Sequence, residues 1–268
     1  PNGLTALYSN TTGYNNTANG AYALRYNTTG YDNTAVGNDS LYYNTTGYDN
    51  TAVGYAALSS TRTGTNNSIV GRYALYYNTS ATSTTALGAM AAQGAANYNN
   101  QGGVYLGYQA GYSAQTGSDY NTLLGYNSGY GVTTGARNVL IGQSTIAASY
   151  NQVTTGSNNI AIGNDVAVAS PTASNQLNIG NLIFGTNLNG TGTPLSTGNI
   201  GIGTTSPYAK LSVVGQTVAE YFTATSTTAT STFAWGLQAN ALNVTSATAS
   251  STFSNGINLS AGCFAVNG

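Results

Sequence analysis

Apolar residues recur along this chain in short alternating runs, and a glycine closes nearly every run. Four consecutive 17-residue units, beginning at Gly13, Gly30, Gly47 and Gly64, have the sequences GYNNTANGAYALRYNTT, GYDNTAVGNDSLYYNTT, GYDNTAVGYAALSSTRT and GTNNSIVGRYALYYNTS. The second glycine of each unit continues the pattern from Gly3 to Gly203, and its spacing is 17 five times and then 19, 18, 17, 21, 17 and 23. This spacing indicates an internal repeat whose later copies carry loop insertions.

The repeat unit predicts strands rather than helices. It is too short for a pair of helices with a loop, and glycine and asparagine recur too often for a helix of useful length. Alternation that ends in glycine is typical of a short strand followed by a tight turn. Within one unit we expect two extended runs, Thr34–Val36 and Ser40–Leu41, with Asn44–Gly47 as the returning turn. The predicted fold class is all-β, a β-solenoid or β-roll of 17-residue coils.

Stacked coils place equivalent residues above one another. The ordinary spacing between strands is about 4.8 Å, so twelve rungs would form a rod on the order of 55–60 Å long. We expect the core to consist of two apolar rows: Val36, Val53, Val70 and Leu87 in one, and Leu7, Leu24, Leu41, Leu58 and Leu75 in the other. Stacked amides can bond up and down a ladder, and we expect such a ladder from Asn16, Asn33, Asn50 and Asn67.

The core that these rows predict is thin for a chain of 268 residues. One medium or large apolar residue per strand buries little area against a backbone entropy of roughly 1–2 kcal/mol per residue. Parallel association of identical coils would bury a second face. We therefore expect a homo-oligomer.

Two motifs carry a resemblance to known families. The segments Asn33–Gly37 and Asn50–Gly54, each followed by a Ser-Leu or Ala-Leu pair, resemble the head repeats of trimeric autotransporter adhesins. They also resemble repeats of phage tail-fibre-like bacterial surface proteins that end in an intramolecular chaperone peptidase domain. The segment Gly198–Gly215 is similar to the junction between repeat region and stalk in those proteins. The resemblance implies a homotrimer, and no residue here matches the chaperone peptidase domain.

The period changes after Pro207. Gly215, Gly236 and Gly256 follow one another at intervals of 21 and 20, and Phe233 and Phe253 are separated by the second of these intervals. We therefore predict a β-roll head domain over 1–203 and a narrow β stalk over 204–268. Because Pro1–Gly3 matches the middle of a unit, we also expect the chain to be part of a longer fibre.

Composition excludes several classes of partner. Only 4% of the residues are charged and the formal net charge is −1, so nothing here would neutralise a run of phosphates or an anionic membrane surface. No apolar stretch is long enough to insert into a membrane. Nucleic acid and lipid are therefore not expected partners. Cys263 is the single cysteine, so no intrachain disulfide can form within this sequence. The sequence is compatible both with a buried thiol and with an interchain disulfide.

The chain offers little material for catalysis. It has no histidine and six acidic residues. Asp32 and Asp49 occupy equivalent positions one coil apart, at about the 5 Å separation of a retaining glycosidase's carboxyl pair. The same position holds Asn15 and Asn66, which favours a solvated ladder over a catalytic pair or a weak cation site. We predict no catalytic residue, no metal site, no cofactor and no enzyme activity.

Tyrosine supplies the candidate contact residues. Tyr14, Tyr31 and Tyr48 repeat at intervals of 17, and such a ladder can stack on sugar rings or partner surfaces, or simply stack on itself within a strand. Four arginines, by contrast, fall at different positions of the unit, which favours solvated side chains over a patch: Arg25, Arg62, Arg72 and Arg137.

The leading hypothesis is a structural extracellular fibre or adhesin that extends from a cell or virion surface and mediates attachment to a glycan or cell-surface receptor. The alternative is a phage tail fibre, or a tailspike that binds or cleaves host glycan. Ice binding is a weaker alternative, because the paired threonines fall in Asn-Thr-Thr-Gly turns rather than on a strand face.

Overall fold

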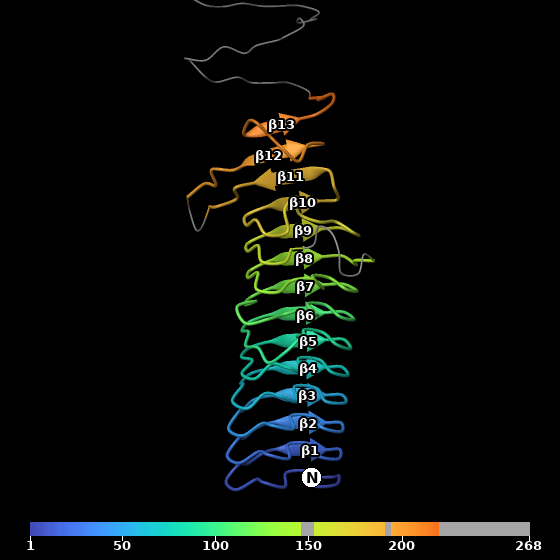
Figure 1. Cartoon of the computed structure of the whole chain (residues 1–268), viewed down its shortest axis with the longest axis vertical. Coiled ribbons are helices and arrows are strands. Elements are labelled where there is room, and N and C mark those ends of the chain that lie inside the picture. The colour runs from blue at the N-terminus through green and yellow to red at the C-terminus, as the bar shows by residue number, and fades with distance from the viewer. Residues whose placement is uncertain (146–152, 191–193, 220–268) are drawn as a thin grey trace, which may run out of the picture. The chain divides into compact units, whose positions relative to one another are not determined.

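The computed structural model describes residues 1–145, 153–190 and 194–219, and these form an all-β structure with no helix. Their strands make one sheet of thirteen in chain order (Figure 1). The strands are β1 (Thr17–Asn19), β2 (Thr34–Val36), β3 (Thr51–Val53), β4 (Ser68–Val70), β5 (Thr85–Leu87), β6 (Val104–Leu106), β7 (Thr122–Leu124), β8 (Val139–Ile141), β9 (Ile160–Ile162), β10 (Leu177–Ile179), β11 (Ile183–Thr186), β12 (Asn199–Ile202) and β13 (Leu211–Val213).

The strands β1 to β10 pair in parallel, and each coil of the chain adds one strand to the sheet beside the strand of the preceding coil. Between β2 and β3, Ala35 lies opposite Ala52, and the coils keep this 17-residue offset from β1 through β5. Glycine follows each of these strands because the coils approach closely there: a Cβ on Gly54 would lie 2.6 Å from the carbonyl oxygen of Gly71. The predicted β-solenoid of 17-residue coils is confirmed.

The return path of each coil differs from the prediction. Ser40–Leu41 is not a strand but part of a run of turns after β2. Asp39 and Leu41 adopt positive φ angles of 57° and 49°. The backbone N–H groups of the run then alternate in direction: Asp39 donates to Ala21 of the preceding coil and Leu41 to Ala57 of the following one, both at 3.0 Å. Left-handed residues reverse the amide direction, so the turns bond both neighbours without extended backbone.

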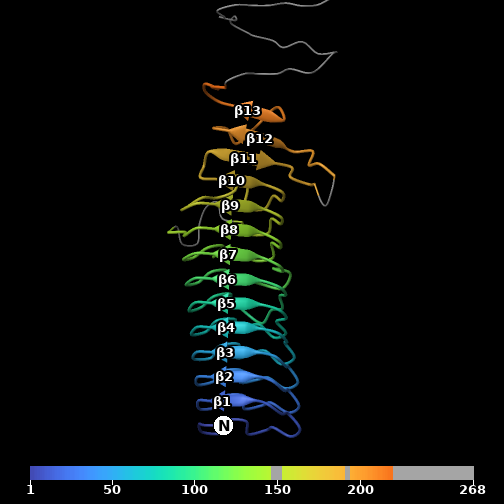
Figure 2. The same cartoon turned by 180° about the vertical axis from the view of Figure 1, so that it is seen from behind.

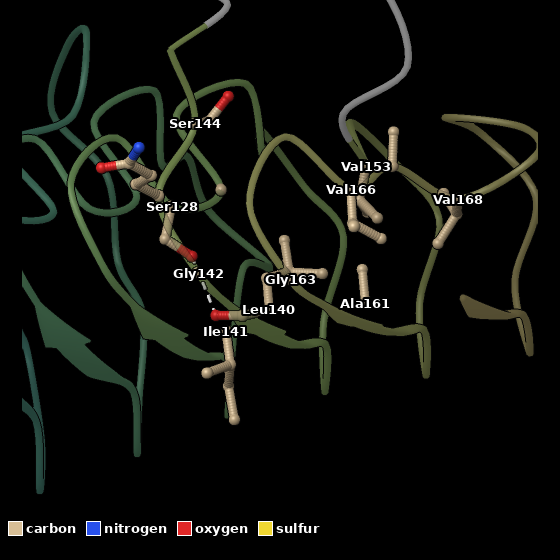
Figure 3. A pocket seen from close by; sticks show the side chains of 13 residues that line it. Ser128, Leu140, Ile141, Gly142, Ser144, Val153, Ala161, Gly163, Val166 and Val168 are labelled. Atoms are coloured by element: carbon tan, nitrogen blue, oxygen red, sulfur yellow. Dashed lines mark hydrogen bonds between the residues drawn. The ribbon is translucent and has the colours of Figure 1, made fainter. Parts of the chain in front are cut away.

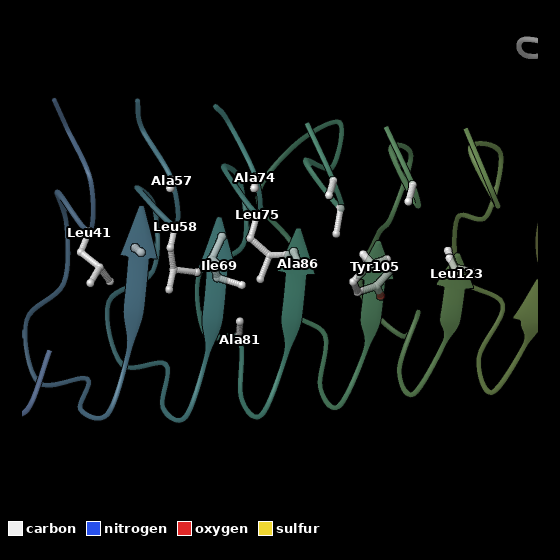
Figure 4. Packing of buried hydrophobic residues seen from close by; sticks show 14 of the residues in the cluster. Leu41, Ala57, Leu58, Ile69, Ala74, Leu75, Ala81, Ala86, Tyr105 and Leu123 are labelled. Carbon is white, nitrogen blue, oxygen red and sulfur yellow. The ribbon is translucent and has the colours of Figure 1, made fainter. Parts of the chain in front are cut away.

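The core contains only one of the two predicted apolar rows. Leu24, Leu41, Leu58 and Leu75 are fully buried, as expected. The predicted valine row lies on the outer face of the sheet instead, where Val70 and Leu87 are 41% and 52% exposed. The middle residue of each strand from β1 to β9 fills the core, and Figure 4 shows Ile69, Ala86 and Tyr105 facing it. In a three-residue strand the side chains alternate, so only the middle one points inward.

Two amide ladders tie the coils together. The predicted ladder is confirmed: the side-chain N–H of Asn33 donates to Asn16 at 3.1 Å, and that of Asn50 to Asn33 at 3.0 Å. A second ladder, which was not expected from the sequence, runs through the Asn-Thr-Thr-Gly turns. There Asn27 donates to Asn10, and Asn44 to Asn27, each at 2.7 Å.

The parallel array ends at β10. After it β11 pairs antiparallel with β10, and β12 pairs antiparallel with β11, so the chain reverses twice before β13 joins in parallel (Figures 1 and 2). The expectation that Gly203 marks a further rung directly above Gly180 is wrong, because the longer interval between them contains this reversal.

The described coils belong to one compact unit, Pro1–Thr217. The predicted head and stalk domains stay predictions, because most of the proposed stalk, 220–268, lies outside the described residues together with Phe233, Phe253 and Cys263.

Candidate functional site

The tyrosines predicted as contact residues form a stacked ladder. The ring centroids of Tyr14 and Tyr31 are 5.0 Å apart, and those of Tyr31 and Tyr48 are 4.8 Å apart, with interplanar angles of 6° and 3°. Tyr14 is 56% exposed. Because each ring covers the face of the next, the ladder presents mainly ring edges to solvent. Their role as surface contacts stays a prediction.

The aspartates of the suggested carboxylate pair have a backbone reason to be there. Asp32 and Asp49 have φ angles of 54° and 55°, and Asn15 and Asn66 at the equivalent positions have 54° and 59°. Asp and Asn tolerate this left-handed conformation better than most residues, which explains why either one occupies this position of the unit. Within 1–145, 153–190 and 194–219, no three acidic, histidine or cysteine side chains gather to hold a metal ion.

The outer face of the sheet is uncharged and partly apolar. None of the thirteen strands of the described residues contains a charged residue. Toward β10 both outward positions of most strands are apolar, as in Val139 with Ile141 and Ile160 with Ile162. Several outward side chains lie in water, among them Leu124 at 41% exposed. An uncharged apolar stripe over many strands is typical of an interaction surface.

A recess lined by tyrosines lies on the turn segments that follow the strands, on the opposite side of the core from the sheet. Its volume is about 270 Å³. Its walls are the rings of Tyr42, Tyr43, Tyr55, Tyr73 and Tyr76. Ala56 and Ser59, both buried, form its floor, and Asp39 lies at its edge. We call this site the tyrosine recess.

The repeat explains why a hollow forms at this coil. Tyr42, Ser59 and Tyr76 occupy the same position in three successive coils, at intervals of 17. Serine therefore leaves a gap between two tyrosines. Ala56 likewise stands one coil before Tyr73, where it leaves a second gap. The tyrosine recess is a place where the unit Gly47–Thr63 departs from its neighbours.

The aromatic walls meet one another edge to face, although Tyr43 also stacks on Tyr26 of the preceding coil. The rings of Tyr55 and Tyr73 are 5.2 Å apart at 90°, and those of Tyr73 and Tyr76 are 5.2 Å apart at 79°. Tyr55 and Tyr76 therefore meet their neighbouring rings edge to face, unlike the tyrosines of the stacked ladder that begins at Tyr14. A hydrogen bond with Tyr73 is the main cause that raises the pKa of Tyr55, and burial raises the pKa of Tyr76. Both hydroxyls keep their protons at neutral pH; that of Tyr55 donates to Tyr73, and that of Tyr76 can donate to a ligand.

Three arginines each lie near a tyrosine ring that lines the recess, although none of them is part of its lining and their positions in the repeat predicted no patch. The guanidinium of Arg62 lies 5.6 Å from the ring centroid of Tyr43, and that of Arg72 lies 4.9 Å from the ring centroid of Tyr73. Arg25 lies 5.9 Å from the ring centroid of Tyr42 on the side of the preceding coil. The three arginines occupy different positions of the 17-residue unit, but each coil folds back on itself and so brings them near the same group of tyrosines.

Asp39 brings one negative charge to the same place. Burial raises its pKa, and the nearby positive charge of Arg25 opposes that rise. Within the described part of the chain, the Asp39 carboxylate forms no hydrogen bond or ion pair. It is therefore available as an acceptor for a ligand hydroxyl.

A second cavity, near β8 and β9, is too small for a ligand. It measures about 30 Å³ and lies between Ser128, Leu140 and Val166 (Figure 3). The hydroxyl of Ser128 is already used, because it donates to the carbonyl oxygen of Leu140 at 2.8 Å. The space suits about one water molecule.

One buried tyrosine belongs to the core rather than to a site. The side chain of Tyr105 is fully buried, and its hydroxyl accepts a hydrogen bond from Asn100 at 2.7 Å. Burial raises the pKa of Tyr105 far above its usual range. Its hydroxyl is satisfied internally, so it has no part in ligand binding.

No known protein family, curated protein or solved structure matches this chain. A search of the described residues for an apolar helix long enough to cross a membrane finds none.

Proposed function

We propose that the chain is a structural segment of a homotrimeric fibre that extends from a cell or virion surface and mediates attachment. The observation that carries this proposal is the parallel stack from β1 to β10, in which successive coils bond through backbone and asparagine ladders. A stack of this kind lengthens by adding coils without a change in local packing. That property suits a spacer that holds a binding surface away from its anchor.

The outer face of the sheet is the proposed contact between copies. It carries no charge in the described strands and exposes apolar side chains such as Leu87 and Leu124. Burial of these side chains against second and third copies would add a hydrophobic layer that the narrow coil lacks. The number of copies and the extracellular location rest on the resemblance to adhesin and tail-fibre repeats.

Light scattering coupled to size-exclusion chromatography tests the assembly. We expect a mass three times the 27.2 kDa of the single chain, and elongated particles by negative-stain electron microscopy. The variant Leu87→Glu places a charge on the outer face and should shift the mass toward that of the monomer.

A matched control adds a charge elsewhere. Asn66 is exposed and occupies the row that already holds Asp32 and Asp49, so Asn66→Asp should leave the mass unchanged. Circular dichroism of both variants verifies that they fold. A monomeric, compact wild-type chain at micromolar concentration would refute the fibre proposal.

A further inference from the structure

We propose that the tyrosine recess binds one sugar ring of an acidic oligosaccharide, whose carboxylate or sulfate groups meet the surrounding arginines. This inference deepens the attachment function and rests on it. The observations behind it do not depend on assembly: the aromatic walls, the carboxylate of Asp39 in the lining, and three arginines beside the lining tyrosines.

The first step is the shape and lining of the recess. A pyranose ring has apolar C–H faces and a rim of hydroxyls, so it packs on tyrosine rings and hydrogen-bonds at its edge. Pockets for drug-sized ligands measure about 300–1,000 Å³, and the 270 Å³ of the recess suits a smaller unit such as one sugar. Tyr42 and Tyr76 stand two coils apart, about 9.6 Å at the ordinary strand spacing, with Ser59 between them. That gap is about one coil high.

The second step is hydrogen bonding. The carboxylate of Asp39, without a hydrogen-bond partner within the described residues, can accept hydrogen bonds from sugar hydroxyls. Bonds to a charged acceptor are roughly twice as strong as neutral ones. The hydroxyl of Tyr55 already donates to that of Tyr73, which leaves the hydroxyls of Tyr73 and Tyr76, in the same recess, to donate to ring or hydroxyl oxygens. Acceptor and donors thus face one small space.

The third step is charge. The chain has five cationic side chains in 268 residues, and Arg25, Arg62 and Arg72 all lie within 6 Å of the centroid of a ring that lines the recess. Arg62 and Arg72 are exposed, so their charges reach solvent. Three guanidinium groups outweigh the single carboxylate of Asp39. Planar guanidinium groups bind carboxylate and sulfate oxygens in pairs, which favours an acidic glycan over a neutral one.

Titration calorimetry with three acidic hexasaccharides tests the site: β-1,4-mannuronate, α-1,4-galacturonate and a heparin fragment. The matched neutral probe is β-1,4-mannohexaose, which differs from the first by a hydroxymethyl group in place of each carboxylate. We expect at least one acidic probe to bind with a Kd below about 1 mM, and binding to exceed that of the neutral probe by at least about tenfold.

Two variants locate the binding. Ser59→Tyr should fold, because Tyr42 and Tyr76 hold tyrosine at the same position of adjacent coils, and it should fill the recess and weaken binding at least about tenfold. The double variant Arg62→Gln/Arg72→Gln should weaken binding of the acidic probe by a similar factor and leave the neutral probe unaffected.

A matched pair of truncations provides the control. Tyr55 lines the recess and is 46% exposed, whereas Tyr126 lies on a later coil and is 50% exposed. Tyr55→Ala should weaken binding and Tyr126→Ala should not. The inference is overturned if no acidic probe binds, if Ser59→Tyr binds as well as wild type, or if the neutral probe binds equally.

The same samples separate this inference from the fibre proposal. Light scattering reports assembly whether or not a glycan is present. A trimer that binds none of the three acidic probes overturns the recess inference alone. A monomer that binds one of them through the recess supports it and removes the fibre proposal alone.

Discussion

The most informative single substitution removes one rung of the buried amide ladder. Asn50 is fully buried; its side-chain N–H groups donate to Asn33 at 3.0 Å and to the carbonyl oxygen of Gly64 at 2.8 Å. Its side-chain oxygen accepts from the backbone and side-chain N–H groups of Asn67. Asn50→Leu keeps the branched shape of the side chain, although leucine is larger, and abolishes all four bonds. It leaves the carbonyl of Gly64 and the backbone N–H of Asn67 buried without these partners.

The magnitude follows from those two groups. Each buried polar group left without a partner costs about 1–3 kcal/mol, so the variant should lose roughly 4 kcal/mol of stability. For a unit of this size that loss lowers the Tm by about 8–16 °C. Thermal unfolding followed by far-ultraviolet circular dichroism measures it.

Asn16→Leu is the matched control at the start of the ladder. Asn16 is only half-buried, and the carbonyl of Gly30 that it binds keeps a second donor, Asn27, at 2.9 Å, so the variant removes only the acceptor of the two N–H groups of Asn33. The expected fall in Tm is about 2–6 °C. If Asn50→Leu lowers the Tm by less than about 2 °C, then the buried amide ladder does not stabilise the stack.

Two further outcomes test the core. Leu58→Ala empties a fully buried leucine position and should lower the Tm by about 6–12 °C, whereas Leu182→Ala, at a residue 56% exposed, should lower it by less than about 3 °C; equal effects would contradict the assignment of the leucine row to the core. Burial keeps Tyr105 protonated in the folded chain, so the unfolded chain loses that proton first, near the ordinary pKa of 10.0, and stability should fall as the pH rises above that value. The fall in Tm between about pH 9 and about pH 11 should be smaller in Tyr105→Phe, and an unchanged slope would exclude Tyr105 as a cause.

Much of the fold could be predicted because the first coils keep a constant period. Glycine at every seventeenth position sets the offset between neighbouring strands, and equal offsets place Asn33 over Asn16 and Leu41 over Leu24. The second extended run could not be predicted this way. Its short apolar run is compatible with a strand in sequence, but in the structure the neighbours Ser40 and Leu41 are both buried, which strand alternation does not allow, and the left-handed backbone at Leu41 is set by bonds to other coils.

The candidate site was predicted less completely than the fold. The tyrosine ladder was visible from its period, but the tyrosine recess arises where the period fails, at Ala56 and Ser59. A comparison of units would have found these gaps. It would not have found Arg62 and Arg72 beside them, because those residues occupy different positions of the unit.

The sequence by itself determined the period, the strand at each glycine, and the vertical stacking of like residues, since each depends only on local backbone preference and a constant spacing. Only the tertiary structure decided which side of each strand faces inward. Ala35 fills the core and Val36 faces out because only the middle residue of a three-residue strand points inward, and both alternatives satisfy the same local pattern. That choice created the apolar outer face, and the folding back of the coil brought Asp39, Tyr76 and the arginines together.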